Sequence, residues 1–308
     1  MKKSIGLILF LLLSTIVCRA QYVKLALNLV KGATYYNLTT ATASVMQTVN
    51  GKTTTINTTI TCRIAFTVTN VRDSLYDMEM RYQSLTLKMQ LPTGTTQYSS
   101  DNVDPADPVS VAFAAFKNQT IALVLTKTGN LQALASMGLI FDRIVGKLTQ
   151  SPPDQRAQIK SLMEQSFGER AFRSNFEMGT AIFPSVPVRK NALWISDSQL
   201  ESARPANVHS IYELRDITET FYQIHVNSTI TYANRDAFIE TNGVPLKYNL
   251  DGSRLADIVV DKVTGWVKQS TIIQNIGGTT EIKDNPKTPG GLIIPTVMRS
   301  DVVITDIH

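Results

Sequence analysis

The sequence predicts an α+β protein that is predominantly antiparallel β, with a long curved sheet packed against a central helical segment. Two observations carry this prediction. The residues from Gln21 to Leu91 are predicted to be strand almost throughout, with apolar and polar side chains alternating with a period of two, and strand patterns resume after residue 183. Between residues 137 and 182 the apolar spacing changes to that of amphipathic helices.

The clearest strand runs from Thr55 to Thr69. Its apolar side chains share one parity, and threonine, asparagine and arginine occupy the other, which places the two sets on opposite faces of a sheet. Asn50-Gly51 precedes this strand and is a strong hairpin signal, so Tyr35–Val49 and Thr53–Val71 are expected to pair antiparallel. The side chains expected to face the core are Ile56, Ile60, Cys62, Ile64, Phe66 and Val68.

A second long strand is expected to begin near Ser74. Apolar residues hold its even positions up to Tyr82 and its odd positions from Leu85 onwards, so a β-bulge is predicted near Ser84. Strands of about 15 residues or more exceed the usual length, and strands that long twist and curl. The sheet is therefore expected to be strongly curved.

The middle of the chain is expected to change from loop to helix. The sequence predicts a polar loop over Pro92–Asp107, a short helix over Val109–Phe116 and a hairpin over Ile121–Leu134. Helices are then predicted over Leu139–Leu148, Ile159–Phe167 and Glu169–Phe176, with Ser151 as a capping residue before two prolines.

Strand patterns resume in the last third of the chain. Alternation predicts a strand over Tyr222–Tyr232, a hairpin turning at Asp261–Gly265, and a closing strand over Thr296–Ile307. Gly277-Gly278 is interpreted as a connection between strands, and His209 as a loop residue.

Four segments follow from this pattern. Residues 1–20 form a signal peptide, residues 21–136 an N-terminal β-unit, residues 137–182 a helical segment and residues 183–308 a C-terminal β-unit. Phe183–Pro187 marks the boundary before the last unit, and the two β-units can also form one continuous domain.

The first twenty residues have the layout of a secretory signal peptide. Lys2 and Lys3 precede an apolar run of about 13 residues, which is too short for a membrane-spanning helix, and small residues lead to a cleavage site between Ala20 and Gln21. The alternative is a lipoprotein signal, in which Cys18 becomes the acylated first residue. An exported protein of the periplasm, the cell surface or the extracellular space is expected, with no transmembrane span in the mature chain.

The net charge argues against nucleic acid as a partner, and the cysteine content argues against a disulfide. Cleavage after Ala20 would remove Lys2, Lys3 and Arg19 and lower the formal net charge from +5 to +2. A nearly neutral chain offers no electrostatic footprint for nucleic acid. Cys62 would then be the one cysteine left, which rules out an intramolecular disulfide and favours a buried, unreactive thiol.

No catalytic or cofactor motif is found. The chain has no Gly-x-Ser-x-Gly, no His-Glu-x-x-His, no zinc-type Cys/His spacing and no phosphate-binding glycine loop, and its three histidines are scattered. A non-catalytic protein without a cofactor is therefore expected.

One acidic cluster has two interpretations. Asp101, Asp104 and Asp107 lie in a loop and could supply oxygen ligands to a calcium ion, but their spacing is not that of an EF-hand. A capped turn leading into the helix at Val109 explains the same residues and is preferred.

The apolar face of the long strands is the remaining candidate for binding. The candidate ligand-binding residues are Tyr76, Met78, Met80, Tyr82 and Met89, which sit on the inward parity and suit either a filled core or a lipid-lined cavity. The preferred function is an envelope protein that binds a lipid or acyl chain, or a protein partner. A structural or assembly protein is the alternative, and an enzyme of unrecognised class comes third.

Several segments together resemble a family of secreted bacterial proteins known only as a domain of unknown function. They are Lys31-Gly32-Ala33-Thr34-Tyr35, Phe183-Pro184, Lys190-Asn191-Ala192-Leu193-Trp194 and Asp261-Lys262-Val263-Thr264-Gly265-Trp266. The resemblance implies a β-rich exported protein and supplies no catalytic residues. A weaker, fold-level likeness is to outer-membrane lipoprotein carriers, in which a curved sheet wraps around helices and holds acyl chains.

Overall fold

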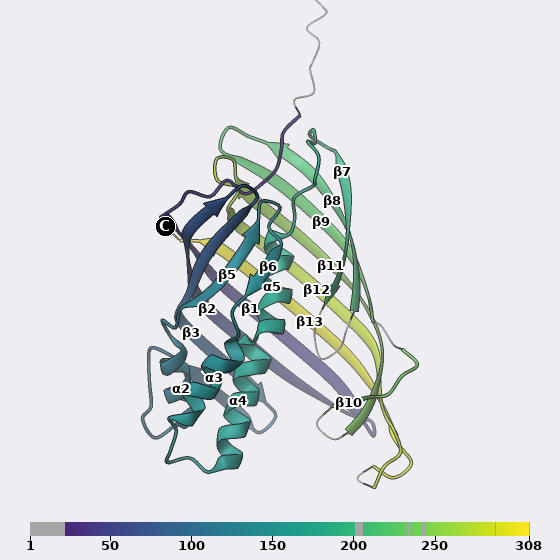
Figure 1. Ribbon diagram of the computed structural model, residues 1–308. Coiled ribbons are helices and arrows are strands. Elements are labelled where there is room, and N and C mark those ends of the chain that lie inside the picture. Colours follow the sequence, from purple (N-terminus) through teal and green to yellow (C-terminus); the bar gives the residue numbers. More distant parts are fainter. Residues whose placement is uncertain (1–21, 201–205, 233–234, 242–243, 287, 308) are drawn as a thin grey trace, which may run out of the picture.

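The protein is built on one strongly curved antiparallel sheet whose concave face holds the helices (Figure 1). The computed structural model describes residues 22–200, 206–232, 235–241, 244–286 and 288–307. Within these residues thirteen strands join in the order β6-β5-β3-β2-β1-β13-β12-β11-β9-β8-β7, while β4 pairs with β3 and β10 with β11. The predicted fold class is confirmed.

The strands are β1 Thr34–Val49, β2 Lys52–Arg72, β3 Leu75–Leu91, β4 Gly94–Ser99, β5 Ile121–Thr126, β6 Leu131–Leu134, β7 Leu193–Leu200, β8 Ala206–Ile217, β9 Phe221–Tyr232, β10 Ile239–Thr241, β11 Val244–Asp261, β12 Val267–Ile282 and β13 Leu292–Asp306. The helices are α2 Pro108–Phe116, α3 Met137–Gly146, α4 Pro153–Phe167 and α5 Glu169–Thr180.

The first hairpin forms as the sequence predicts. Val49 pairs with Lys52, and the turn residues Asn50 and Gly51 both have positive φ, which asparagine and glycine tolerate best. On β2 the inward side chains of Phe66 and Val68 are fully buried. The alternation therefore reports the buried face correctly.

The predicted bulge is also present. Arg63 pairs with Ser84, but the next pair is Ile64 with Tyr82, so Gln83 is the extra residue in β3. The shift allows Tyr82 and Leu85 to point to the same face although their positions differ in parity.

Five local predictions are wrong. The expected loop after Pro92 contains β4, whose threonine-rich sequence lacks apolar alternation and which pairs with β3 through a two-residue turn. Gly277 and Gly278 lie inside β12, where a Cβ on Gly278 would meet the Asn249 carbonyl oxygen at 2.1 Å. Close backbone approach explains this glycine better than a turn does.

His209 lies in β8 and not in a loop. Helix α4 begins at Pro153 with no side-chain cap, so Ser151 does not cap it. The segment before β1 was expected to be strand from Gln21 onwards, yet between Tyr22 and Ala33 it makes one isolated bridge, between Val23 and Val188.

This N-terminal segment closes one end of the concave face. Its alternate leucines are buried, and its backbone N–H groups donate to turns in both halves of the sheet: Leu27 to the Lys127 carbonyl at 2.8 Å and Asn28 to the Thr264 carbonyl at 2.7 Å. It therefore links the β5–β6 turn to the β11–β12 turn.

Strands from the two ends of the chain meet in the middle of the sheet. β1 pairs with β13 over eleven residue pairs, from Asn37 with Asp306 to Gln47 with Thr296. The strands on either side of the helical segment therefore belong to one sheet. Figure 1 shows the helices gathered over one end of it, with the distal ends of β11, β12 and β13 extending past them.

Candidate functional site

An apolar cavity lies between helices α4 and α5 and the concave face of the sheet. Its accessible volume is about 120 Å³, comparable with an engineered cavity of about 150 Å³ that admits benzene. The floor comes from β1, β2, β3, β12 and β13, and the roof from the end of α4 and most of α5. We refer to it as the apolar cavity.

The floor is built from inward side chains that the sheet register places side by side. Ile60 pairs with Ala41, Ala41 with Val302, and Val302 with Ile272, so one row crosses four strands on the same face. Here a row means a set of residues paired directly across neighbouring strands. The remaining sheet residues that line the apolar cavity are Asn37, Thr39, Cys62, Ile64, Phe66, Tyr82, Val267 and Ile304.

The roof is aromatic but leaves room at one point. Phe172 and Phe176 of α5 stack at a centroid distance of 5.1 Å, and Phe176 also packs against Phe66 at 5.4 Å. Gly179 faces Ile304, and a Cβ at this glycine would come within 3.4 Å of the Ile304 Cδ1 atom. Absence of a side chain at Gly179 therefore keeps space between α5 and β13.

The ionisable groups in the lining are held neutral. Burial raises the pKa of the Cys62 thiol to about 12. Burial, followed by the proximity of Cys62, raises the pKa of the Tyr82 phenol well above its usual value. Asn37 accepts a hydrogen bond from the Trp266 indole N–H at 3.2 Å. The lining thus presents uncharged groups, which suits an apolar occupant.

The structure places the predicted ligand-binding residues at different depths. Tyr82 lines the apolar cavity. Tyr76, Met78 and Met80 are buried outside it, each with at most 1% of its surface exposed. Met89 is half-buried farther along β3, where it pairs with Thr58. The alternating pattern predicts correctly that these side chains face the concave side. It does not predict where they lie relative to the helices.

Sequence reasoning missed most of the residues that line the cavity. Ala41 and Val302 come from strands 261 residues apart that meet only in the folded sheet. The amphipathic pattern of α5 was recognised, but not which part of the sheet it covers. The one signal in the sequence is Gly179, a small residue three positions after the predicted end of this helix at Phe176.

The acidic loop forms a capped turn. Asp107 is the N-cap of α2 and accepts from the backbone N–H groups of Val109 and Ser110, and Asp104 accepts from Ala106. Asp101 pairs with Lys117 at 2.6 Å. Among the described residues no group of three or more His, Cys, Asp or Glu side chains is arranged to hold a metal ion.

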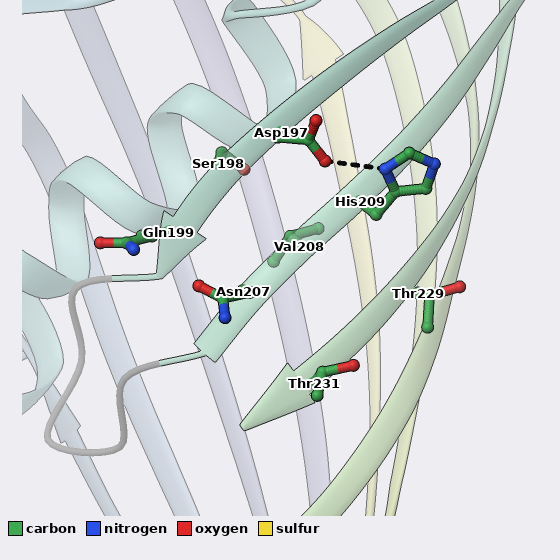
Figure 2. Close-up of a pocket in the computed structure, with 8 residues that line it drawn as sticks. All are labelled: Asp197, Ser198, Gln199, Asn207, Val208, His209, Thr229 and Thr231. Carbon is green, nitrogen blue, oxygen red and sulfur yellow. Dashed lines mark hydrogen bonds and ion pairs between the residues drawn. The ribbon is translucent and has the colours of Figure 1, made fainter. Parts of the chain in front are cut away.

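A second hollow lies on the outer face, away from the helices. It measures about 480 Å³, is open to solvent, and is lined mainly by polar side chains of β7, β8 and β9. Figure 2 shows its central contact, in which the His209 Nδ1 atom lies 2.7 Å from an Asp197 carboxylate oxygen. The side chains of these residues are 50% and 77% exposed, so solvent screens the pair.

The expected cleavage site at Ala20 and Gln21, and the alternative lipidation site at Cys18, lie outside the described residues. No helix in the described part of the chain is long and apolar enough to cross a membrane.

Comparison with known sequences identifies the family. Residues 73–267 match a family of unknown function, DUF6263. The chain belongs to this family. The match includes the helical segment and the strands from β3 to β11, and it ends at the first residue of β12. No curated protein matches the chain.

Among solved structures the chain is similar to the one titled "Lipid-protein interactions in lipovitellin", with a TM-score of 0.50 and 9% identity. The similarity covers 91% of this chain but 26% of lipovitellin, so the chain spans about a quarter of that protein. An outer membrane channel from Pseudomonas putida F1 is 9% identical with a TM-score of 0.27, over 91% of this chain and 97% of that one. At this level of identity the lipovitellin match indicates a shared fold, and the channel's score is too low to bear on it.

Proposed function

We propose that this DUF6263 protein is an exported, non-catalytic envelope protein that binds an acyl chain in the apolar cavity between α5 and the concave face of the sheet. The observation that carries the proposal is the cavity itself. Its lining is mostly apolar, and its ionisable groups are neutral. It lies at the edge of the region that the helices cover, and beyond this edge the strands continue with further inward side chains.

Rows beyond the helices extend this surface. Val45 on β1, Ile56 on β2 and Met298 on β13 form a paired row on the same face, and all three are only partly buried. A ligand whose chain enters the cavity would extend toward this row, with Ala43, Thr58 and Ser300 lying between the two. Burying ~300 Å² of apolar surface would contribute roughly 7 kcal/mol before the costs of association, which sets micromolar binding as the upper limit of affinity.

The similarity to lipovitellin is compatible with this proposal, since that structure is described by its lipid–protein interactions. The chemistry of the lining, and not the similarity, is the reason for assigning the function here.

A fluorescent fatty acid tests the proposal. Ala41→Phe would fill the cavity from the half-buried floor, and we expect it to weaken binding at least tenfold with little loss of melting temperature. Thr42→Phe, on the exposed opposite face of the same strand, is the matched control and should bind as the wild type does.

Cys62 provides an independent readout. In a Cys18→Ser chain it is the one thiol, it lines the cavity, and it is 7% exposed. A bound acyl chain should slow its alkylation. If no acyl probe binds saturably and none protects Cys62, acyl binding is refuted and a partner-binding or structural role replaces it.

A further inference from the structure

A band of polar side chains crosses the otherwise apolar concave face, one row beyond the apolar cavity. The register pairs these residues in sequence across six strands, from β7 to β13: Ser196, Ser210, Ser228, Arg254, Gln274 and Ser300. We call this set the polar band. Because directly paired residues point to the same side of a sheet, all six face the concave side.

The rows on either side show how unusual the band is. The row toward the helices contains Tyr212, Val226, Ala256, Ile272 and Val302, the last two of which line the apolar cavity. The row on the far side contains Val208, Ile230, Ile276 and Met298. Polar side chains between two apolar rows are unfavourable for stability, because a buried polar group loses its hydrogen bonds to water unless it is paired. This cost suggests that the polar band serves a function.

Arg254 carries a charge that the chain does not neutralise. It is 5% exposed, and its guanidinium donates to Ser228 Oγ at 3.1 and 3.3 Å and to Ser210 Oγ at 3.2 Å. The Tyr212 hydroxyl in the neighbouring row also interacts with the guanidinium, so all three partners of Arg254 are hydroxyls and none is a carboxylate. Among the described residues no Asp or Glu forms a salt bridge with Arg254. Buried cations normally have an anionic partner, so a ligand is the natural source of one.

We propose that the polar band binds the anionic headgroup, a carboxylate or a phosphate, of an amphiphile whose chain occupies the apolar cavity. This inference rests on the proposed acyl-chain function and specifies its ligand class. Gln274 and Ser300 are half-buried and lie two residues along their strands from Ile272 and Val302, roughly 7 Å from the cavity floor. The headgroup would meet these two side chains first, and Arg254, beside Gln274, supplies the charge.

The experiment compares cis-parinaric acid with its methyl ester, which has the same chain without the charge. The wild type should bind the acid about tenfold more tightly than the ester at pH 8. Arg254→Gln should abolish this preference and leave the affinity for the ester unchanged. Arg299→Gln removes the same charge from the outer face of β13, next to Ser300, and should retain the preference.

A second variant covers the case in which Arg254→Gln does not fold. Gln274→Glu places a carboxylate beside Arg254 at a half-buried position, and it should lower the affinity for the acid while sparing the ester. Equal binding of acid and ester by the wild type would overturn the headgroup site and leave the acyl-chain function standing. Failure of both ligands to bind would refute the function and the inference together.

A third arm separates a headgroup from a free anion. Inorganic phosphate should not displace the bound acid at equal concentration, because it lacks the chain that the cavity holds. If phosphate alone stabilises the wild type but not Arg254→Gln, while acid and ester bind equally, the site takes a free anion and the headgroup assignment is wrong.

Discussion

The two ends of the concave face are made of similar side chains but differ in what covers them. On β3, Met78 and Met80 lie in the covered region and are fully buried. On β1 and β2, Val45 and Ile56 face the same side yet remain partly exposed, because the strands extend beyond the helices. Inward parity alone therefore does not distinguish a core from a binding surface. Whether helices cover the strand determines which of the two it is. The apolar cavity lies at the boundary between the covered and the open region.

The largest expected effect contrasts these two ends directly. Met80→Asp buries an unpaired carboxylate in the covered region and should cost more than about 4 kcal/mol of stability, or prevent folding. Val45→Asp makes the same chemical change on the open row and should cost about 1 kcal/mol or less, because solvent reaches it. Chemical denaturation measures both. Similar losses would show that the open rows are covered in solution.

The second prediction concerns the pH dependence at the boundary. The pKa of the Cys62 thiol is raised to about 12 from an ordinary value of 9.0, so the folded protein disfavours the thiolate. This contribution to stability is complete below pH 9 and is lost as the pH rises toward 12. The free energy of unfolding of the wild type, relative to Cys62→Ala, should fall by about 1.4 kcal/mol per pH unit above pH 9. A constant difference between pH 8 and pH 11 would mean that the thiol is solvated.

A smaller effect is expected where the N-terminal segment seals the covered end. The Tyr76 hydroxyl donates to the Leu27 carbonyl at 2.9 Å and accepts from the Leu29 N–H at 3.3 Å. Tyr76→Phe leaves buried backbone groups without these partners and should cost about 1–3 kcal/mol. Hydrogen exchange should show faster opening of residues 22–30, whereas unchanged exchange there would indicate that the segment is held by its leucines alone.

The smallest effect concerns the acidic loop, which lies away from the boundary. Asp107→Ala removes the N-cap of α2 and should cost about 1 kcal/mol, and Asp107→Asn should restore most of it. Because the aspartates are engaged in capping and in a pair with Lys117, calcium should leave the melting temperature unchanged. A calcium-dependent rise that Asp107→Asn abolishes would establish a metal site instead.

The amino-acid pattern by itself determined the local features. Alternation along β2 identified its buried face, Asn50-Gly51 set the first hairpin, and the change of parity near Ser84 placed the bulge. Helical spacing located α2 to α5 within a few residues. These features depend on interactions between near neighbours in the chain, which is why a single sequence reveals them.

Only the tertiary structure decided which distant segments lie side by side. The pairing of β1 with β13, the position of α5 over that seam, and the six-strand polar band around Arg254 all require register across residues far apart in sequence. Arg254 has an ordinary polar neighbourhood along the chain, and its lack of an acidic partner is visible only once β8, β9 and β11 are paired. Long-range register results from the packing of the whole sheet around its helices, and no local pattern encodes it.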